Sequence, residues 1–371
     1  MSREPAVTGR GKDELTRAAR QLVDAAVADG LVPGAVLAAG LAGQTQLVHV
    51  SGDAQRDDAA CRPMTTATIF DLASLTKVVA TTPCVLSLVA AGQTGLDDPV
   101  VRYLPSFAGP GKAQVTVRQL LCHTSGLPDQ RRYYQQLTDG GAALAAALTE
   151  PLVAAPGSAC RYSDVGFIVL GQLAAAVAGC DLAELAQRVV CEPLRLTSTM
   201  FCPPAALTAS IASTEVVNGI AKTGIVHDEN ADLLGGVAGH AGLFGTAADL
   251  SRFAGAWVSA DPEPAAAWLP GWLRAEAMRC QTDGLGGRRG LGWGLRHDTW
   301  DNMGDGWPES GAGHTGFTGT SLSVDPVTGL WSVLLTNAVH FGRSRPGRSV
   351  AGLRRQVHAA VAAALLAGGS V

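Results

Sequence analysis

Apolar positions recur with a regular period at the start of the chain. Between residues 13 and 29 they return every three or four positions, which predicts a helix with one apolar face. Two strand-like runs follow at residues 35–41 and 46–50. Gly43 and Gln44 lie between these runs, so we expect the two strands to form a hairpin.

The far end of the chain repeats this arrangement. Strand-like runs at residues 321–324 and 331–336 flank the turn-forming residues 325–329, which predicts a second hairpin. Residues 350–366 then carry apolar side chains at helical spacing. We therefore expect the two ends of the chain to share one antiparallel sheet, covered by the terminal helices.

The middle of the chain has a different pattern, in which helical segments alternate with loops rich in Gly and Pro. The predicted helices cover residues 116–121, 142–149, 164–178, 181–190 and 247–258. The fold class expected from these patterns is α/β (α+β). After a polar tail at residues 1–12, a single catalytic domain would cover residues 13–371. Its α/β lobe would comprise residues 13–95 and 291–371, and a mainly helical lobe at residues 96–290 would be inserted in it.

A long apolar stretch begins at Ser74 and has no charged residue between Lys77 and Asp97, which predicts a buried helix. Ser74 and Lys77 are three residues apart, so both side chains lie on one face of this helix. Burial lowers the pKa of an amine, and a neutral Lys77 could then take the proton of the serine hydroxyl. Free N–H groups at the helix start could bind an oxyanion. The alternative is a surface pair without chemistry.

Composition restricts the classes of function. The chain has 371 residues, of which 47% are hydrophobic and 16% charged, and its formal net charge is −4. This is enough apolar material for a large core, and without a basic run we expect no nucleic-acid partner. We expect no membrane span, because no uninterrupted apolar run reaches about 20 residues. Residues 1–14 show no secretory signal, which predicts a cytoplasmic location. The eight cysteines lack metal-ligand spacing and are expected to be reduced.

Five motifs in a fixed order resemble the serine β-lactamase and penicillin-binding-protein superfamily. They are Phe70–Lys77, Leu121–Pro128, Tyr162-Ser163-Asp164, Gly236–Phe244 and His314-Thr315-Gly316. The closest branch is the class C β-lactamase-like one, which also contains D-amino-acid peptidases, esterases and transacylases. The resemblance covers residues 15 to 365. It implies a β-lactamase/transpeptidase-like fold and chemistry that uses neither a cofactor nor a metal.

The resemblance also implies roles for single residues. Ser74 corresponds to the nucleophile and Lys77 to its partner base. Tyr162 corresponds to the tyrosine that passes a proton between serine and leaving group, and a neighbouring cation would favour its phenolate. The simpler alternative for Tyr162 is an aromatic residue that caps a helix. The backbone N–H groups of Ser74 and Phe317 would form the oxyanion hole.

Two positions depart from the family pattern. Asp164 stands where asparagine is usual, so it cannot donate to a substrate amide, but it could pair with Lys77 or cap the following helix. His314 stands where lysine is usual, which would replace a fixed cation by a group that titrates near pH 6.5. A substrate carboxylate would then be held less firmly at neutral pH. The alternative is a structural histidine on a sheet edge. Small residues at this edge, including Thr315 and Gly316, would let a substrate lie alongside.

Three further residues, His227, Asp228 and His240, could together suggest a metal site. Their spacing matches no metal-binding motif, so we expect them to line the pocket instead.

Two other segments have weaker interpretations. The motif at residues 121–128 is typical of a helix exit and tight turn, with an architectural role. The tryptophan-rich segment at residues 293–307 could form an aromatic wall for the substrate or belong to the core, and the sequence leaves both readings open.

The mechanism we expect is covalent acyl transfer through Ser74, from a small-molecule ester, amide or lactam. Transfer to water would make the protein an esterase- or peptidase-type hydrolase. Transfer to an amine would make it a transacylase in small-molecule biosynthesis. The third possibility is a non-catalytic ligand sensor that kept the fold, for which Asp164 and His314 are the only support.

Overall fold

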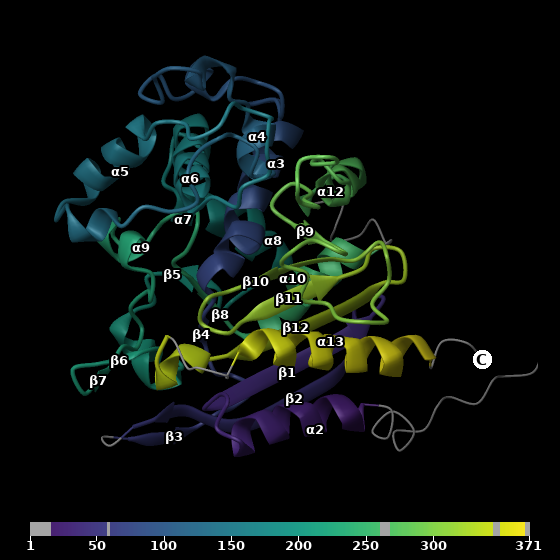
Figure 1. Ribbon diagram of the computed structural model, residues 1–371. Helices are drawn as coiled ribbons and strands as arrows, with labels where there is room; N and C mark the ends of the chain where they lie inside the picture. Colours follow the sequence, from purple (N-terminus) through teal and green to yellow (C-terminus); the bar gives the residue numbers. More distant parts are fainter. Residues whose placement is uncertain (1–15, 58–59, 260–267, 344–348, 368–371) are drawn as a thin grey trace, which may run out of the picture.

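The computed structural model of the protein describes residues 16–57, 60–259, 268–343 and 349–367 (Figure 1). A seven-stranded antiparallel sheet forms its centre. The strands in spatial order are β3 (Cys61–Pro63), β2 (Gln44–Arg56), β1 (Gly34–Leu41), β12 (Leu330–Thr336), β11 (Ser321–Val324), β10 (Ala312–Thr315) and β9 (Gly294–Leu295). β1 pairs with β12, with Ala35 opposite Thr336. This pairing joins the two ends of the chain in one sheet, as predicted.

Both predicted hairpins are present. The turn between β1 and β2 is formed by Ala42 and Gly43, both with positive φ (48° and 76°), which is the geometry that suits a two-residue hairpin. The second hairpin joins β11 to β12 through residues 325–329. Strand β2 is longer than the predicted 46–50, because it continues past β1 to pair with β3.

The continuous apolar run of β1 is explained by burial on both faces of the sheet. Leu37 packs in one core with α2 (Arg17–Ala28) and α13 (Val350–Ala367), the two terminal helices, which lie together on one face (Figure 1). Val36, its neighbour, points to the opposite face. There α10 (Ala247–Val258) packs against β1 and β12. This helix therefore belongs to the sheet layers and not to the helical lobe at residues 96–290 that the sequence predicts.

The remaining helices gather beyond one end of the sheet. They include α3 (Thr82–Ala90), α4 (Val117–Leu121), α5 (Gly140–Thr149), α6 (Asp164–Ala178), α7 (Leu182–Ala186), α8 (Glu192–Leu194), α9 (Glu229–Leu233) and α12 (Gly271–Met278). Three short strands, β4 (Phe70–Asp71), β8 (Leu243–Gly245) and β5 (Met200–Phe201), form a second sheet, and β6 (Val216–Val217) pairs with β7 (Ile220–Ala221). The predicted helices are confirmed to within a few residues at their ends.

The segment that carries Ser74 is buried but irregular. It opens with a 3₁₀ turn at Ala73–Leu75, continues as a wide π-helical turn at Lys77–Thr81 and becomes regular only in α3. Such π turns occur often at functional sites. The stretch Ala73–Ala90 is long and apolar enough to cross a membrane, but 78% of it is buried inside the fold, as in a core helix.

Candidate active site

The turn before Ser74 is fixed by a hydrogen bond within it and by another from the loop that follows β10. Asp71 Oδ1 accepts the Ala73 N–H at 2.8 Å, and Ala73 has a φ of 47°, which is unfavourable for a residue with a Cβ. Thr318 Oγ1 donates to the Asp71 carbonyl at 2.8 Å. A Cβ on Gly316 would meet the Leu72 carbonyl oxygen at 2.6 Å. The end of β10 therefore lies directly against the Ser74 turn, which requires glycine at position 316.

Lys77 is completely buried beneath Ser74, and its ammonium group has three partners. Nζ donates to Ser74 Oγ at 2.9 Å and to the carbonyl oxygen of His240 at 3.0 Å. It also lies 2.7 Å from Oδ1 of Asp164 in an ion pair. Oδ1 of Asp164 accepts no hydrogen bond, so this third contact is electrostatic. The structure therefore brings Ser74, Lys77 and Asp164 together as the sequence predicted.

The charge of Lys77 differs from our expectation. Burial disfavours the ammonium form, but the Asp164 carboxylate and the Tyr162 hydroxyl outweigh it, so the pKa of Lys77 lies above its ordinary value. The expectation that burial would lower this pKa is wrong, because the interaction with the Asp164 carboxylate is stronger than the effect of burial. Lys77 is thus a cation that donates to Ser74 in the resting site.

Tyr162 is placed over this cation by the start of α6. Its ring centroid lies 5.0 Å from Lys77 Nζ. The next residue, Ser163, is the N-cap of α6 and accepts the Gly166 N–H at 2.9 Å. Of the two roles considered for Asp164, pairing with Lys77 is the observed one, since the helix cap is Ser163.

His123 holds Tyr162 in position. Its Nδ1 accepts the N–H of Ser163 at 3.0 Å, and its ring lies 4.6 Å from the Tyr162 ring. Burial, reinforced by Arg289 and Lys77, keeps the pKa of His123 well below its ordinary value, so the ring is neutral. The sequence predicted an architectural motif here, but the contact with Tyr162 could not be read from it.

His314, on β10, is buried with its ring 5.9 Å from that of Tyr162. Its Nδ1 donates to the carbonyl oxygen of Thr315 at 2.9 Å, which leaves Nε2 as the nitrogen without a proton. Burial and the charges of Lys77 and Arg289 hold the pKa of His314 well below its ordinary value. Titration near pH 6.5 was therefore the wrong expectation, and the ring is neutral at physiological pH.

Phe317 follows Gly316 at the end of β10, and this places it beside the Ser74 turn. Its ring is 60% exposed and stacks on His227 with the ring centroids 5.7 Å apart. The pKa of His227 is lowered, chiefly by burial. Phe317 thus combines a backbone position suited to the oxyanion hole with a large exposed side chain.

The three residues considered as metal ligands do not converge. His240 Nε2 lies 2.9 Å from Asp228 Oδ1, whereas the His227 ring faces Glu215 at 3.2 Å and Phe317. Within the described ranges, no group of three His, Cys, Asp or Glu side chains could hold a metal ion. His227 and His240 instead shape the wall and floor around Ser74 and Lys77.

Sequence reasoning missed a buried ion pair beside the site. Arg289 Nη2 lies 2.7 Å from Asp298 Oδ2, and its guanidinium carbon lies 5.5 Å from the Tyr162 ring centroid. Neither residue belongs to one of the five motifs, and no local pattern signals the pair.

Sequence reasoning also missed the burial and the shifted pKa of Asp71. Its carboxyl group is fully buried and accepts hydrogen bonds from the N–H groups of Ala73 and, at 2.6 Å, His227. Burial raises the pKa of Asp71 to about 6. The position of Asp71 inside the Phe70–Lys77 motif was the only signal that could have indicated it.

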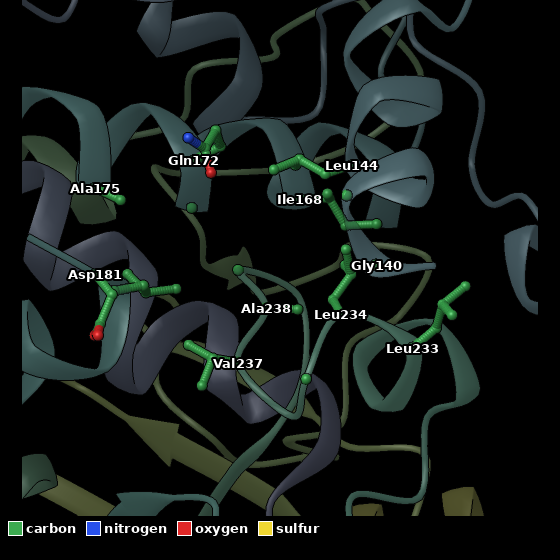
Figure 2. A pocket seen from close by; sticks show the side chains of 15 residues that line it. Gly140, Leu144, Ile168, Gln172, Ala175, Asp181, Leu233, Leu234, Val237 and Ala238 are labelled. Carbon is green, nitrogen blue, oxygen red and sulfur yellow. The ribbon is translucent and has the colours of Figure 1, made fainter. Parts of the chain in front are cut away.

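A separate cavity of about 500 Å³ lies between α5, α6 and the loop at residues 233–239 (Figure 2). Its lining is mostly apolar, with Leu144, Ile168 and Leu234 among the side chains. None of the predicted site residues lines it. It is therefore distinct from the site around Ser74, although Gly239 in its wall directly precedes His240.

In this site a buried lysine is hydrogen-bonded to a serine, a tyrosine lies over the lysine, and the end of a strand lies beside the serine. This arrangement is typical of serine enzymes that form acyl-enzymes. The sequence model of the Beta-lactamase family matches residues 19–355, and the chain belongs to this family. A relative from Escherichia coli (strain K12), named "Putative D-alanyl-D-alanine carboxypeptidase", is 31% identical over an alignment 310 residues long, which covers 74% of this chain and 70% of the relative.

Two solved structures have the same fold. One is EstCE1, described as a hydrolase with promiscuous acyltransferase activity, with a TM-score of 0.75, 23% identity and coverage of 96% of this chain and 100% of that one. The other is a penicillin-binding-protein homologue from Caulobacter crescentus, with a TM-score of 0.75, 21% identity and coverage of 95% and 98%. The predicted fold class is confirmed. The chain is an enzyme of the serine hydrolase or acyltransferase type, which argues against the non-catalytic alternative.

Proposed function

We propose that the protein is a hydrolase in which Ser74 attacks an ester or amide carbonyl and passes the acyl group to water. The observation that carries this proposal is the 2.9 Å contact between Ser74 Oγ and Nζ of the fully buried Lys77. Such a lysine can exchange protons with the serine without competition from bulk water. The names of the relative and of EstCE1 support the same class of reaction.

Because Lys77 is protonated in the resting site, it must lose a proton before it can take the hydroxyl proton of Ser74. Lys77 first passes a proton to Asp164, 2.7 Å away, and the neutral amine then takes the proton of the Ser74 hydroxyl. The Ser74 Oγ–carbon bond then forms, and the N–H groups of Ser74 and Phe317 stabilise the oxyanion, at about 3–4 kcal/mol per donor. Tyr162 protonates the leaving group as its bond to the carbonyl carbon breaks. Water then attacks the acyl-enzyme and gives a proton to the Tyr162 oxygen, and the proton held by Asp164 returns through Lys77 to Ser74 as the bond between Ser74 Oγ and the acyl carbon breaks.

An amine is the second candidate for the acceptor, because EstCE1, which shares the fold, is described as a hydrolase with promiscuous acyltransferase activity. His314 Nε2 bears no proton and is buried beside Tyr162, so it can accept a hydrogen bond from an incoming N–H or O–H group. Product analysis with an activated ester and a set of primary amines tests this route. Amide products would support it, and free acid alone would count against it.

Intact-protein mass spectrometry tests the acyl-enzyme itself. The protein is incubated with a fluorophosphonate and with 4-nitrophenyl esters, beside the variants Ser74→Ala and Ser87→Ala. Ser87, on α3 of the same apolar segment, is the matched control. We expect an adduct in the wild type and in Ser87→Ala, and none in Ser74→Ala. An adduct or full turnover in Ser74→Ala would refute the assignment.

A further inference from the structure

Aromatic rings surround the site on several sides, and two of them are exposed. Trp300 is 67% exposed and Phe317 is 60% exposed, whereas Trp293, Trp307 and Trp331 are buried in the cores. Both interpretations of the tryptophan-rich segment at residues 293–307 therefore apply. Trp300 lies at the site, whereas Trp293 and Trp307 belong to the core. Large exposed aromatic side chains next to a nucleophile are typical of a surface that binds a ligand.

The two exposed rings flank different parts of the reaction. Trp300 lies 6.3 Å from the ring of Tyr162, the residue that serves the leaving group in the function proposed above. Phe317 stacks at 22° on His227 and carries the N–H group of the oxyanion hole, so its ring flanks the acyl group. The neutral His227 supports the Phe317 ring from behind. A bound acyl donor would thus contact one ring at each end.

Two of the buried cations around the site are paired with carboxylates, and a third, Arg354, donates to the carbonyl oxygen of Gly316 at 2.6 Å. Lys77 pairs with Asp164, and the buried Arg289 pairs with Asp298. His314, at the strand position where the family resemblance implies a cation, presents an acceptor nitrogen instead of a donor. A substrate carboxylate placed there would face a lone pair, and a desolvated carboxylate without a partner is costly.

We propose that this site takes a neutral acyl donor with an apolar or aromatic acyl group. Phe317 contacts that group and Trp300 covers the leaving group or the acceptor. Donors that carry a carboxylate on the acyl group are poor substrates. This inference rests on the acyl transfer through Ser74 proposed above.

The apolar contact is tested by kcat/KM for 4-nitrophenyl esters from acetate to octanoate. Each methylene that becomes buried adds about fourfold, which corresponds to about 0.8 kcal/mol. Phe317→Ala should lower the ratio of octanoate to acetate at least tenfold. Trp272→Ala, which removes a 62% exposed tryptophan from α12, is the matched control and should leave the ratio unchanged. An equal loss in both variants, or no loss in Phe317→Ala, would overturn the apolar contact.

The charge discrimination is tested with 4-nitrophenyl butyrate and mono-4-nitrophenyl succinate, whose acyl chains have the same length. We expect the wild type to prefer butyrate at least tenfold. His314→Lys should raise the relative kcat/KM of the succinate ester at least tenfold, whereas His314→Gln, which stays neutral, should not. Preference for the succinate ester, with turnover abolished in Ser74→Ala, would overturn this inference alone. Turnover that persists in Ser74→Ala would overturn the proposed function instead.

Discussion

Replacement of Asp164 by asparagine tests the charge state of the site most directly. Asparagine has nearly the same shape, so Asp164→Asn removes the negative charge 2.7 Å from Lys77 Nζ and little else. At an effective dielectric constant of about 20, two unit charges at this distance attract by about 6 kcal/mol. Because the Asp164 side chain is 25% exposed and solvent screens it, we take about half of this value, or 3 kcal/mol.

The pKa of Lys77 should therefore fall in Asp164→Asn, because the negative charge that raises it is removed. The rising limb of kcat/KM against pH should move to lower pH for the same reason. On the plateau kcat/KM should fall about 10²-fold, because Asp164 no longer takes the proton of Lys77.

Stability should change in a direction that the pKa of Lys77 fixes. A lysine whose pKa is raised by folding stabilises the protein below its unfolded value of about 10.4, and this contribution is lost as pH rises through the raised value. Asp164→Asn should thus lower the free energy of unfolding by about 3 kcal/mol between pH 6 and 9.

The assays are pH–rate profiles with a 4-nitrophenyl ester and urea unfolding, with Asp305→Asn as control. The Asp305 side chain is fully exposed, so the same chemical change there should alter neither measurement. A rising limb of kcat/KM at the wild-type pH in Asp164→Asn would refute the reasoning, since Asp164 would then not control the charge of Lys77.

Two further predictions concern the segments that support the site. The pKa of the buried Asp71 is about 6 in the folded protein and about 3.9 in the unfolded chain, so its contribution to stability, about 3 kcal/mol, is present at low pH and lost as pH rises through 6. Urea unfolding between pH 4 and 7 should show this slope in the wild type but not in Asp71→Asn, and an unchanged slope would contradict it. Gly239→Ala places a Cβ 1.9 Å from the Phe167 carbonyl oxygen and should cost at least 2 kcal/mol, with loss of kcat/KM as the loop that binds Lys77 shifts. Gly352→Ala on α13 meets nothing within 4 Å and should stabilise the protein by about 0.5–1 kcal/mol; a Gly239→Ala variant as stable as this control would contradict the packing.

Most of the local structure could be predicted from the pattern of residues along the chain. Apolar periodicity predicted the terminal helices, both hairpins and the helix that became α6, because period and turn residues act within a few positions. The spacing of Ser74 and Lys77 placed both side chains on one helical turn for the same reason. Resemblance in five motifs then supplied Tyr162 and the end of β10 as partners of that turn.

Tertiary structure alone decided the charges. Lys77 is a cation because α6 brings Asp164 within 2.7 Å, and His314 is neutral because it is buried near Lys77 and Arg289. The pairing of Arg289 with Asp298 and the exposure of Trp300 likewise follow from packing. A protonation state depends on burial and on charges within a few ångströms, and these come from segments far apart in the chain. Local sequence patterns do not contain such distances, so they indicated the candidate site residues but not their charges.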